Sequence, residues 1–412
     1  MRDAAAFAKA TSAKVGSAEA TAAEAGSAKA TAAKVGSAQT EGSASVNAPS
    51  YVRAIAPYQG GRPIEEVALE LGLAPESIIK LASNENPLGM PPGARAAAAA
   101  ALADVGRYPD GNSTALKAEL SRRLGVPVAW LTLGNGSNDI LELAASLMLT
   151  PGCSCIYSQH AFAVYALATQ ARGARAIETP ARELGHDLAA MQAAIAADTR
   201  LIYIANPNNP TGTLLAPDAL QAFMDAVPPH VVVVLDEAYN EYLPAGVRYD
   251  SLPWVRRHPN LIVSRTFSKI YGLAGLRVGY GIAQQDMTDL LNRIRQPFNA
   301  NSVAQAAARA ALDDEDFVRR SVALNERGRT ELLAGLTAMG LQLAPANGNF
   351  VLVRVGPAAA VYQELLRRGV IVRPVANYGL PQWLRVTVGL PEENARFLRE
   401  LPQALAKAAS DA

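Results

Sequence analysis

The chain has 412 residues, of which 50% are hydrophobic and 18% charged, and its 38 Lys and Arg against 37 Asp and Glu leave a formal charge of +1. A charge balance this even gives no support for a nucleic-acid or membrane-surface role. The sequence has no strongly apolar run of roughly 18 residues, so no membrane-spanning helix is predicted. Two cysteines cannot build a disulfide framework, so we expect a reducing, cytoplasmic setting.

An alanine-rich repeat occupies the beginning of the chain. From Ala10 onward the sequence reads ATSAKVGSAE, ATAAEAGSAK and ATAAKVGSAQ, which are three near-copies of one decapeptide. This composition cannot bury enough apolar surface to offset the entropy of ordering, so residues 1–49 are predicted to be a disordered tail. A signal peptide has a compact apolar stretch after a basic start, and the sequence shows no such stretch here. The folded part is expected to begin near Tyr51.

The segment 130–149 (WLTLGNGSNDILELAASLML) predicts a strand, a glycine turn and a helix. The strand runs into Gly134, and the helix begins near Ser137. Free amides at a helix N-terminus form an anion site without any lysine. The third glycine of the dinucleotide-binding fingerprint is missing, so this turn does not predict a nicotinamide or flavin site.

Short apolar runs then recur, rich in β-branched residues and bounded by turn residues. They are LIYIA (201–205), VVVVLD (231–236), LIVSRT (261–266) and RVGYGIA (277–283). The first three begin 30 residues apart, with helical stretches such as 217–227 between them. This spacing predicts strand–helix–strand units and an α/β fold with a mostly parallel, buried sheet.

The pattern changes after Gln296, where strands and helices become segregated as in an α+β domain. The expected elements are a long helical stretch (302–340), a strand (349–355), a helix (358–369) and strands at 370–375 and 383–390. We therefore predict four parts: the tail (1–49), an N-terminal segment that packs with the small domain (50–84), a large α/β domain (85–297) and a small C-terminal domain (298–412).

Polar residues follow two of the predicted strands. Asp236 ends the valine run, so its carboxylate emerges at the carboxyl edge of a parallel sheet, where such sheets bind ligands. It could hold a pyridine nitrogen protonated, with Tyr239 available for a phenolic hydrogen bond, or it could simply cap the next element. One strand earlier, NPNNPTG (206–212) supplies Asn209 in a proline-restricted loop, and a plain turn is the alternative interpretation.

The segment RTFSKIYGLAGLRVGY (265–280) places a lysine in a loop after a strand. A lone loop lysine is usually a solvated charge. Here Thr266, Ser268 and Arg277 accompany Lys269, and hydroxyls beside an arginine suit a phosphate. A lysine can also form a Schiff base with a carbonyl cofactor. This segment is the strongest chemical signal in the chain.

Eight motifs, in this order and spacing, resemble the class I/II aminotransferases, which are pyridoxal-phosphate enzymes of fold type I. Of the class I/II aminotransferases, the histidinol-phosphate aminotransferase family is the most similar, and the likeness extends from about Pro57 to Glu393. It implies a large α/β domain with a mostly parallel sheet and a smaller α+β domain. The motifs are LASNENPLG (81–89), RYPDG (107–111), GNGSND (134–139), NPNNPTG (206–212), DEAY (236–239), RTFSKIYGLAGLRVGY (265–280), RQPFNANS (295–302) and LRVTVGL (384–390).

The resemblance implies roles for individual residues toward pyridoxal 5'-phosphate (PLP). Lys269 would form the Schiff base with PLP, and Asp236 would pair with the pyridine nitrogen. Tyr239 and Asn209 would hydrogen-bond the ring hydroxyl, while Phe162 would stack on the ring face. The cofactor phosphate would be held by Ser137, Asn138, Thr266, Ser268 and Arg277.

It also implies a homodimer, in which Tyr108 of RYPDG would reach the phosphate of the other subunit's cofactor. Arg385 would bind the substrate α-carboxylate, and Tyr58 would help to close the site over the substrate side chain, with Asn209 at the same site. No metal ion is expected. Cys153 and Cys155 lack partners at metal-ligand spacing and are predicted to be structural thiols.

The sequence departs from the family pattern at two places, of which the second bears on the substrate. Asn138 stands where the family commonly has an acid, and QHAFAVY (159–165) differs from the usual Pro-Thr-Phe/Tyr sequence. The leading function implied is amino transfer between L-histidinol phosphate and 2-oxoglutarate in histidine biosynthesis. The alternatives are an aromatic (phenylalanine or tyrosine) aminotransferase and a PLP-dependent decarboxylase of a phosphorylated amino acid. A PLP-sensing transcription regulator would need a DNA-binding module, and residues 1–49 contain no such pattern.

Overall fold

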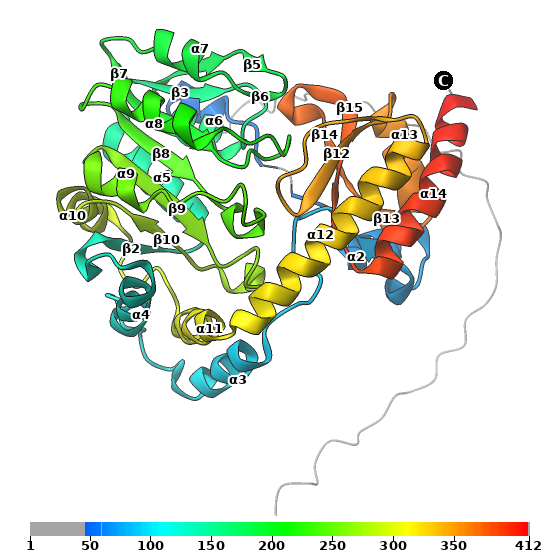
Figure 1. The fold of residues 1–412 in the computed structure, drawn as a ribbon, viewed down its shortest axis with the longest axis horizontal. Coiled ribbons are helices and arrows are strands. Elements are labelled where there is room, and N and C mark those ends of the chain that lie inside the picture. Colours follow the sequence, from blue (N-terminus) through cyan, green and yellow to red (C-terminus); the bar gives the residue numbers. More distant parts are fainter. Residues whose placement is uncertain (1–45, 59, 411–412) are drawn as a thin grey trace, which may run out of the picture. The chain divides into compact units, whose positions relative to one another are not determined.

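The computed structural model describes residues 46–58 and 60–410. The predicted disorder of the alanine-rich repeats lies outside these residues. Figure 1 shows helices packed on two separate sheets, a larger and a smaller one, and the chain from Ala48 onward forms one unit. Within the described ranges, no helix is both long enough and apolar enough to cross a membrane.

The larger sheet has seven strands in the order β2-β10-β9-β8-β7-β3-β4. Neighbouring strands from β4 to β9 are parallel, whereas β10 is antiparallel to both β9 and β2. The strands are β2 (Leu131–Gly134), β3 (Ser154–Ser158), β4 (Arg175–Thr179), β7 (Thr199–Ala205), β8 (Val232–Asp236), β9 (Leu261–Thr266) and β10 (Gly279–Ile282). The predicted α/β fold with a mostly parallel central sheet is confirmed.

Both faces of this sheet are covered by helices, so the valines of β8 are divided between two cores. Val233 and Leu235 belong to one hydrophobic cluster, and Val232 and Val234 belong to the other. Helices of the first face are α3 (Pro92–Ala101), α4 (Thr114–Leu124), α7 (Leu188–Ala193), α8 (Pro217–Ala226), α9 (Leu252–Arg257) and α11 (Ser302–Asp313). Helices of the second face are α5 (Ser137–Met148), α6 (Val164–Ala171) and α10 (Gln285–Ile294).

The smaller sheet has the strand order β11-β12-β15-β14 and a separate core. Its strands are β11 (Gln342–Leu343), β12 (Phe350–Arg354), β14 (Arg373–Val375) and β15 (Leu380–Thr387), and its helices are α12 (Glu315–Ala338), α13 (Ala358–Arg367) and α14 (Pro391–Ser410). An early segment joins this half, because β1 (Ile79–Lys80) pairs in parallel with β13 (Val370–Ile371). Val67 of α2 (Ile64–Leu71) packs into the same region.

The predicted helical stretch 302–340 is two helices rather than one. Asp314 separates α11 from α12, and its side chain caps α12 by accepting a hydrogen bond from the Phe317 amide at 2.9 Å. The predicted domain division stays a prediction. However, α11 packs into the core of the larger sheet, which favours a boundary between α11 and α12 over one at residue 298.

Short elements complete the described chain. They are α1 (Ser50–Arg53), the hairpin of β5 (Ala181–Arg182) and β6 (Gly185–His186), and the 3-10 turns η1 (Pro75–Ser77), η2 (Leu102–Asp104), η3 (Val128–Trp130), η4 (Asn240–Tyr242), η5 (Ala274–Leu276) and η6 (Ala376–Tyr378).

Candidate active site

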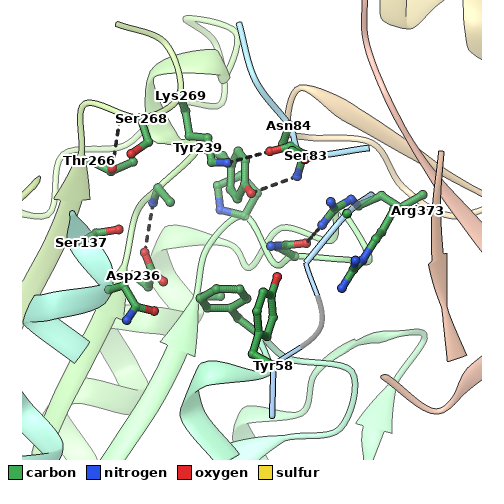
Figure 2. A pocket seen from close by; sticks show the side chains of 18 of the residues that line it. Tyr58, Ser83, Asn84, Ser137, Asp236, Tyr239, Thr266, Ser268, Lys269 and Arg373 are labelled. Atoms are coloured by element: carbon green, nitrogen blue, oxygen red, sulfur yellow. Dashed lines mark hydrogen bonds between the residues drawn. The ribbon is translucent and has the colours of Figure 1, made fainter. Parts of the chain in front are cut away.

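A cavity of about 440 Å³ lies where the carboxyl ends of β7, β8 and β9 face the smaller sheet. Figure 2 shows side chains from both halves converging on it. All but one of the site residues predicted from the sequence line this cavity. They are Tyr58, Ser137, Asn138, Phe162, Asn209, Asp236, Tyr239, Thr266, Ser268, Lys269, Arg277 and Arg385.

Asp236 ends β8 and is 6% exposed. Its carboxylate accepts hydrogen bonds from the Tyr165 hydroxyl at 2.9 Å and from the Ala238 amide at 3.2 Å. Burial raises the pKa of Asp236 to about 6, although both hydrogen bonds favour the charged form. Tyr165 was not among the predicted residues. It is held by a stacked contact with Tyr203, with ring centroids 4.6 Å apart.

Lys269 lies in the loop after β9, and its ammonium donates a hydrogen bond to the Ser83 carbonyl oxygen at 3.2 Å. Burial, reinforced by the positive charge of Arg385, lowers the pKa of Lys269 to about 8. A larger fraction of neutral amine is therefore present near neutral pH than for an exposed lysine, and the neutral amine is the nucleophilic form.

This lowered pKa predicts a pH-dependent stability of the cofactor-free protein. Between pH 8 and the ordinary lysine pKa of 10.5, the unfolded chain binds more protons than the folded chain, so stability rises with pH. Lys269→Met, which has no charge to bury, should be more stable than wild type at pH 7 by at most about 3 kcal/mol. Urea unfolding at pH 7 and pH 10 should show this difference shrinking. An equal difference at both values would contradict the assignment.

An anion cradle is formed at the N-terminus of α5. Ser137 begins the helix after Gly136, whose φ is 86°. A Cβ on Gly136 would overlap the Arg277 guanidinium, so glycine is needed for this approach. Arg277 donates to the Ser268 hydroxyl at 3.2 Å, and the Ser268 amide donates to the Thr266 hydroxyl at 3.1 Å. Helix amides, hydroxyls and a guanidinium together suit a phosphate.

Two arginines of the smaller sheet line the opposite wall. Arg373 and Arg385 are register partners on β14 and β15, so like charges lie directly across from each other. Arg385 donates to the Asn209 side-chain oxygen at 2.5 Å and to the Ala82 carbonyl at 2.6 Å. Its buried Nε has no partner among the described residues. Such a pair suits a ligand with strong negative charge.

Arg373 was missed in the sequence, as was Asn84. Asn84 is 1% exposed and donates from Nδ2 to the Tyr239 hydroxyl at 3.0 Å. Arg373 lies in the predicted strand 370–375 (VIVRPV), and Asn84 lies in the motif LASNENPLG. An arginine interrupting an apolar strand was an available signal for Arg373.

Comparison with known proteins matches this chain to one family. The profile of "Aminotransferase class I and II" covers residues 76–401. The chain belongs to this family.

Three relatives of this aminotransferase illustrate the similarity. Histidinol-phosphate aminotransferase 2 of Ralstonia nicotianae is 65% identical over 364 residues, which is 87% of this chain and 97% of that protein. Histidinol-phosphate aminotransferase 1 of Cupriavidus pinatubonensis is 64% identical over 361 residues, with 87% and 96% covered. The crystal structure of histidinol-phosphate aminotransferase from Sinorhizobium meliloti in complex with pyridoxal-5'-phosphate has a TM-score of 0.81 at 28% identity, covering 89% of this chain and 99% of that one.

Tyr108 is the predicted site residue that lies apart from the cavity of this aminotransferase. It is 83% exposed and stacks on Phe298, with ring centroids 4.7 Å apart. Its predicted role concerns a second subunit, so a single chain does not test it.

Proposed function

We propose that this aminotransferase uses PLP to transfer an amino group between L-histidinol phosphate and 2-oxoglutarate. The observation that carries the proposal is the gathering of Lys269, Asp236 and the anion cradle in one cavity. The 65% identity to the histidinol-phosphate aminotransferase of Ralstonia nicotianae supports the choice of substrate.

The donor set of the cavity fits PLP. The cradle at Ser137 and Arg277 offers donors for the phosphate, and Asp236 is a buried carboxylate without a cation hydrogen-bonded to it among the described residues. A protonated ring nitrogen would supply that cation, and the pair would hold the carboxylate ionised. Phe162, lining the same cavity, would cover the ring. When bound, PLP supplies an electron sink that stabilises negative charge at the substrate carbon.

The chain's own residues then bind the substrate and move protons. Lys269 would hold the cofactor through Nζ, and its amine would serve as acid and base at the substrate carbon. Its lowered pKa, about 8, suits both directions of proton transfer near neutral pH. The Ser83 carbonyl, which accepts from Nζ, helps to hold the amine in the cavity.

The arginine pair supports a phosphorylated donor. L-Histidinol phosphate carries a phosphate and no carboxylate, whereas 2-oxoglutarate carries two carboxylates. Because both substrates would occupy the same cavity in turn, we infer that Arg373 and Arg385 bind the phosphate in one half-reaction and a carboxylate in the other. Guanidinium groups match both anions in bidentate geometry.

Substrate profiling tests this function. The purified chain, loaded with PLP, is assayed with 2-oxoglutarate and either L-histidinol phosphate or phenylalanine as the donor. We expect kcat/KM to favour the phosphorylated donor by at least about 100-fold, since loss of a charged, desolvated contact costs several kcal/mol. A preference for phenylalanine would establish the aromatic aminotransferase instead, and release of CO2 from a phosphorylated amino acid offered in place of these donors would establish a decarboxylase.

We also propose that the active form is a cytoplasmic homodimer. An aromatic side chain as exposed as Tyr108 suggests a contact surface. Apolar neighbours in the same region support it, namely Leu102 (59% exposed), Val105 (53%) and Phe298 (44%).

A mixing experiment tests whether Tyr108 acts across the dimer. Tyr108→Ala and Lys269→Ala should each be impaired alone. In a hybrid dimer, one of the two sites would combine Lys269 of one protomer with Tyr108 of its partner. Refolding the two variants together should therefore restore about a quarter of wild-type activity, the share expected for random pairing in a symmetric dimer. If the mixture is no more active than the sum of its parts, Tyr108 does not act in the partner's site.

A further inference from the structure

The side chain of Asn84 joins the cavity to the smaller sheet. Asn84 has a φ of 54°, a left-handed conformation that asparagine tolerates better than most residues. Its backbone amide donates to the Thr387 hydroxyl at 2.9 Å, and that hydroxyl donates to Asn84 Oδ1 at 3.1 Å. Thr387 ends β15, two residues after Arg385.

These contacts determine which way the Asn84 amide faces. The Thr387 hydroxyl has one hydrogen, and it already accepts from the Asn84 backbone, so its hydrogen goes to Oδ1. With Oδ1 committed, Nδ2 faces the Tyr239 hydroxyl at 3.0 Å. The opposite orientation would set two donors against Thr387 and leave its hydrogen without an acceptor in this network.

The orientation of Asn84 in turn fixes the Tyr239 hydroxyl. An amide nitrogen can only donate, so the Tyr239 oxygen accepts from Asn84 and keeps its own hydrogen for another partner. Tyr239 lines the cavity beside Lys269, whose Nζ is 5.7 Å from the phenol ring centroid. Burial raises the pKa of Tyr239 to about 12, so the hydroxyl stays protonated near neutral pH.

We propose that Asn84 and Thr387 are positioning residues that aim the Tyr239 hydrogen at the cofactor's ring oxygen. This inference rests on the proposed use of PLP. The negatively charged ring oxygen holds a proton on the lysine nitrogen bound to PLP, so a donor to that oxygen lowers the pH at which visible absorbance titrates. Without the hydrogen bond from the Thr387 hydroxyl, the Asn84 amide can rotate by half a turn. Its Oδ1 would then accept the Tyr239 hydrogen and divert that hydrogen from the cofactor.

The test compares two substitutions of Thr387 in the PLP-loaded protein. Thr387→Val keeps the shape of the side chain but removes the hydroxyl that orients Asn84, whereas Thr387→Ser keeps that hydroxyl. Absorbance titration should show the midpoint rising by about one pH unit in T387V, a tenfold change in the proton equilibrium, and returning toward wild type in T387S. If T387V stays at the wild-type midpoint, or if both variants shift alike, the inference is wrong.

A double variant separates orientation from general damage. Asn84→Gly tolerates the positive φ and removes the side chain that Thr387 orients. In the N84G background, T387V should therefore cause no further shift, so the two effects are not additive. Additive shifts would show that Thr387 acts in some other way.

Binding to the cofactor-free protein gives a second readout. T387V should weaken binding of PLP several-fold but leave binding of 3-deoxypyridoxal phosphate, which lacks the ring oxygen, unchanged. Equal weakening of both would overturn the inference.

If T387V does not fold, Asn84→Asp serves instead, because its carboxylate draws the Tyr239 hydrogen directly and should weaken PLP binding selectively. If no variant and no wild-type protein gains visible absorbance with PLP, the proposed function fails, whereas a wild-type titration with unshifted variants refutes only the role of Asn84 and Thr387.

Discussion

Lys269→Ala should lose transamination by at least about 10³-fold while still binding PLP. The substitution removes both the covalent attachment and the acid–base group, each of which contributes strongly to rate. The cradle at Arg277 and the carboxylate of Asp236 remain, so affinity for PLP should be retained through noncovalent contacts. Single-turnover assays measure the first effect, and equilibrium dialysis of PLP measures the second.

The matched control is Lys269→Arg, which keeps the positive charge but cannot release its proton near neutral pH. Borohydride treatment should fix a pyridoxyl group to the wild-type chain and to neither variant. Activity above a tenth of wild type in K269A, or a pyridoxyl adduct on another lysine, would contradict the assignment of Lys269.

The second large effect is expected for Asp236→Asn, which keeps the shape of the side chain and removes its charge. Without the anion, the ring nitrogen of PLP would not be held protonated, and the electron sink would weaken. We expect kcat/KM to fall by roughly 10²–10⁴-fold, the range of a single positioned proton-transfer or charge contact. Asp236→Glu, which keeps the charge but displaces it, should retain more activity than D236N.

Stability distinguishes this effect from misfolding. Because the pKa of Asp236 is raised from 3.8 to about 6, the folded cofactor-free protein binds more protons than the unfolded chain between these values, and wild-type stability should fall as pH rises through that window. D236N has no carboxyl to ionise, so this fall should be absent. Cofactor-free D236N should then be at least as stable as wild type at pH 7 by thermal unfolding. A large loss of stability would mean that the fall in activity reports unfolding.

Local sequence was sufficient to predict where the site residues on the larger sheet lie. Asp236 and Lys269 each follow a run of β-branched residues, and in parallel strand–helix–strand units the ends of such strands meet at one edge. Turn chemistry near Gly136 likewise predicted the start of α5. For these residues the chemistry and the strand that positions it lie within a few positions of each other.

The residues on the opposite wall depend on distant pairing. Arg373 and Arg385 share a face because β14 and β15 are antiparallel in one particular register, which no local pattern specifies. Asn84 meets Thr387 across 303 positions of the chain. The sequence also did not predict the break between α11 and α12 at Asp314, because a single capping residue inside a helical pattern is difficult to distinguish from a surface position.

The contact between Asn84 and Thr387 also governs when the enzyme can become complete during synthesis. Every strand of the larger sheet leaves the ribosome before Thr387 does, so that sheet and its cradle can form first. Asn84 can meet Thr387 only after β15 has been made, which is later than every strand of the larger sheet. A nascent chain arrested before β15 would thus present the phosphate cradle without the contact between Asn84 and Thr387.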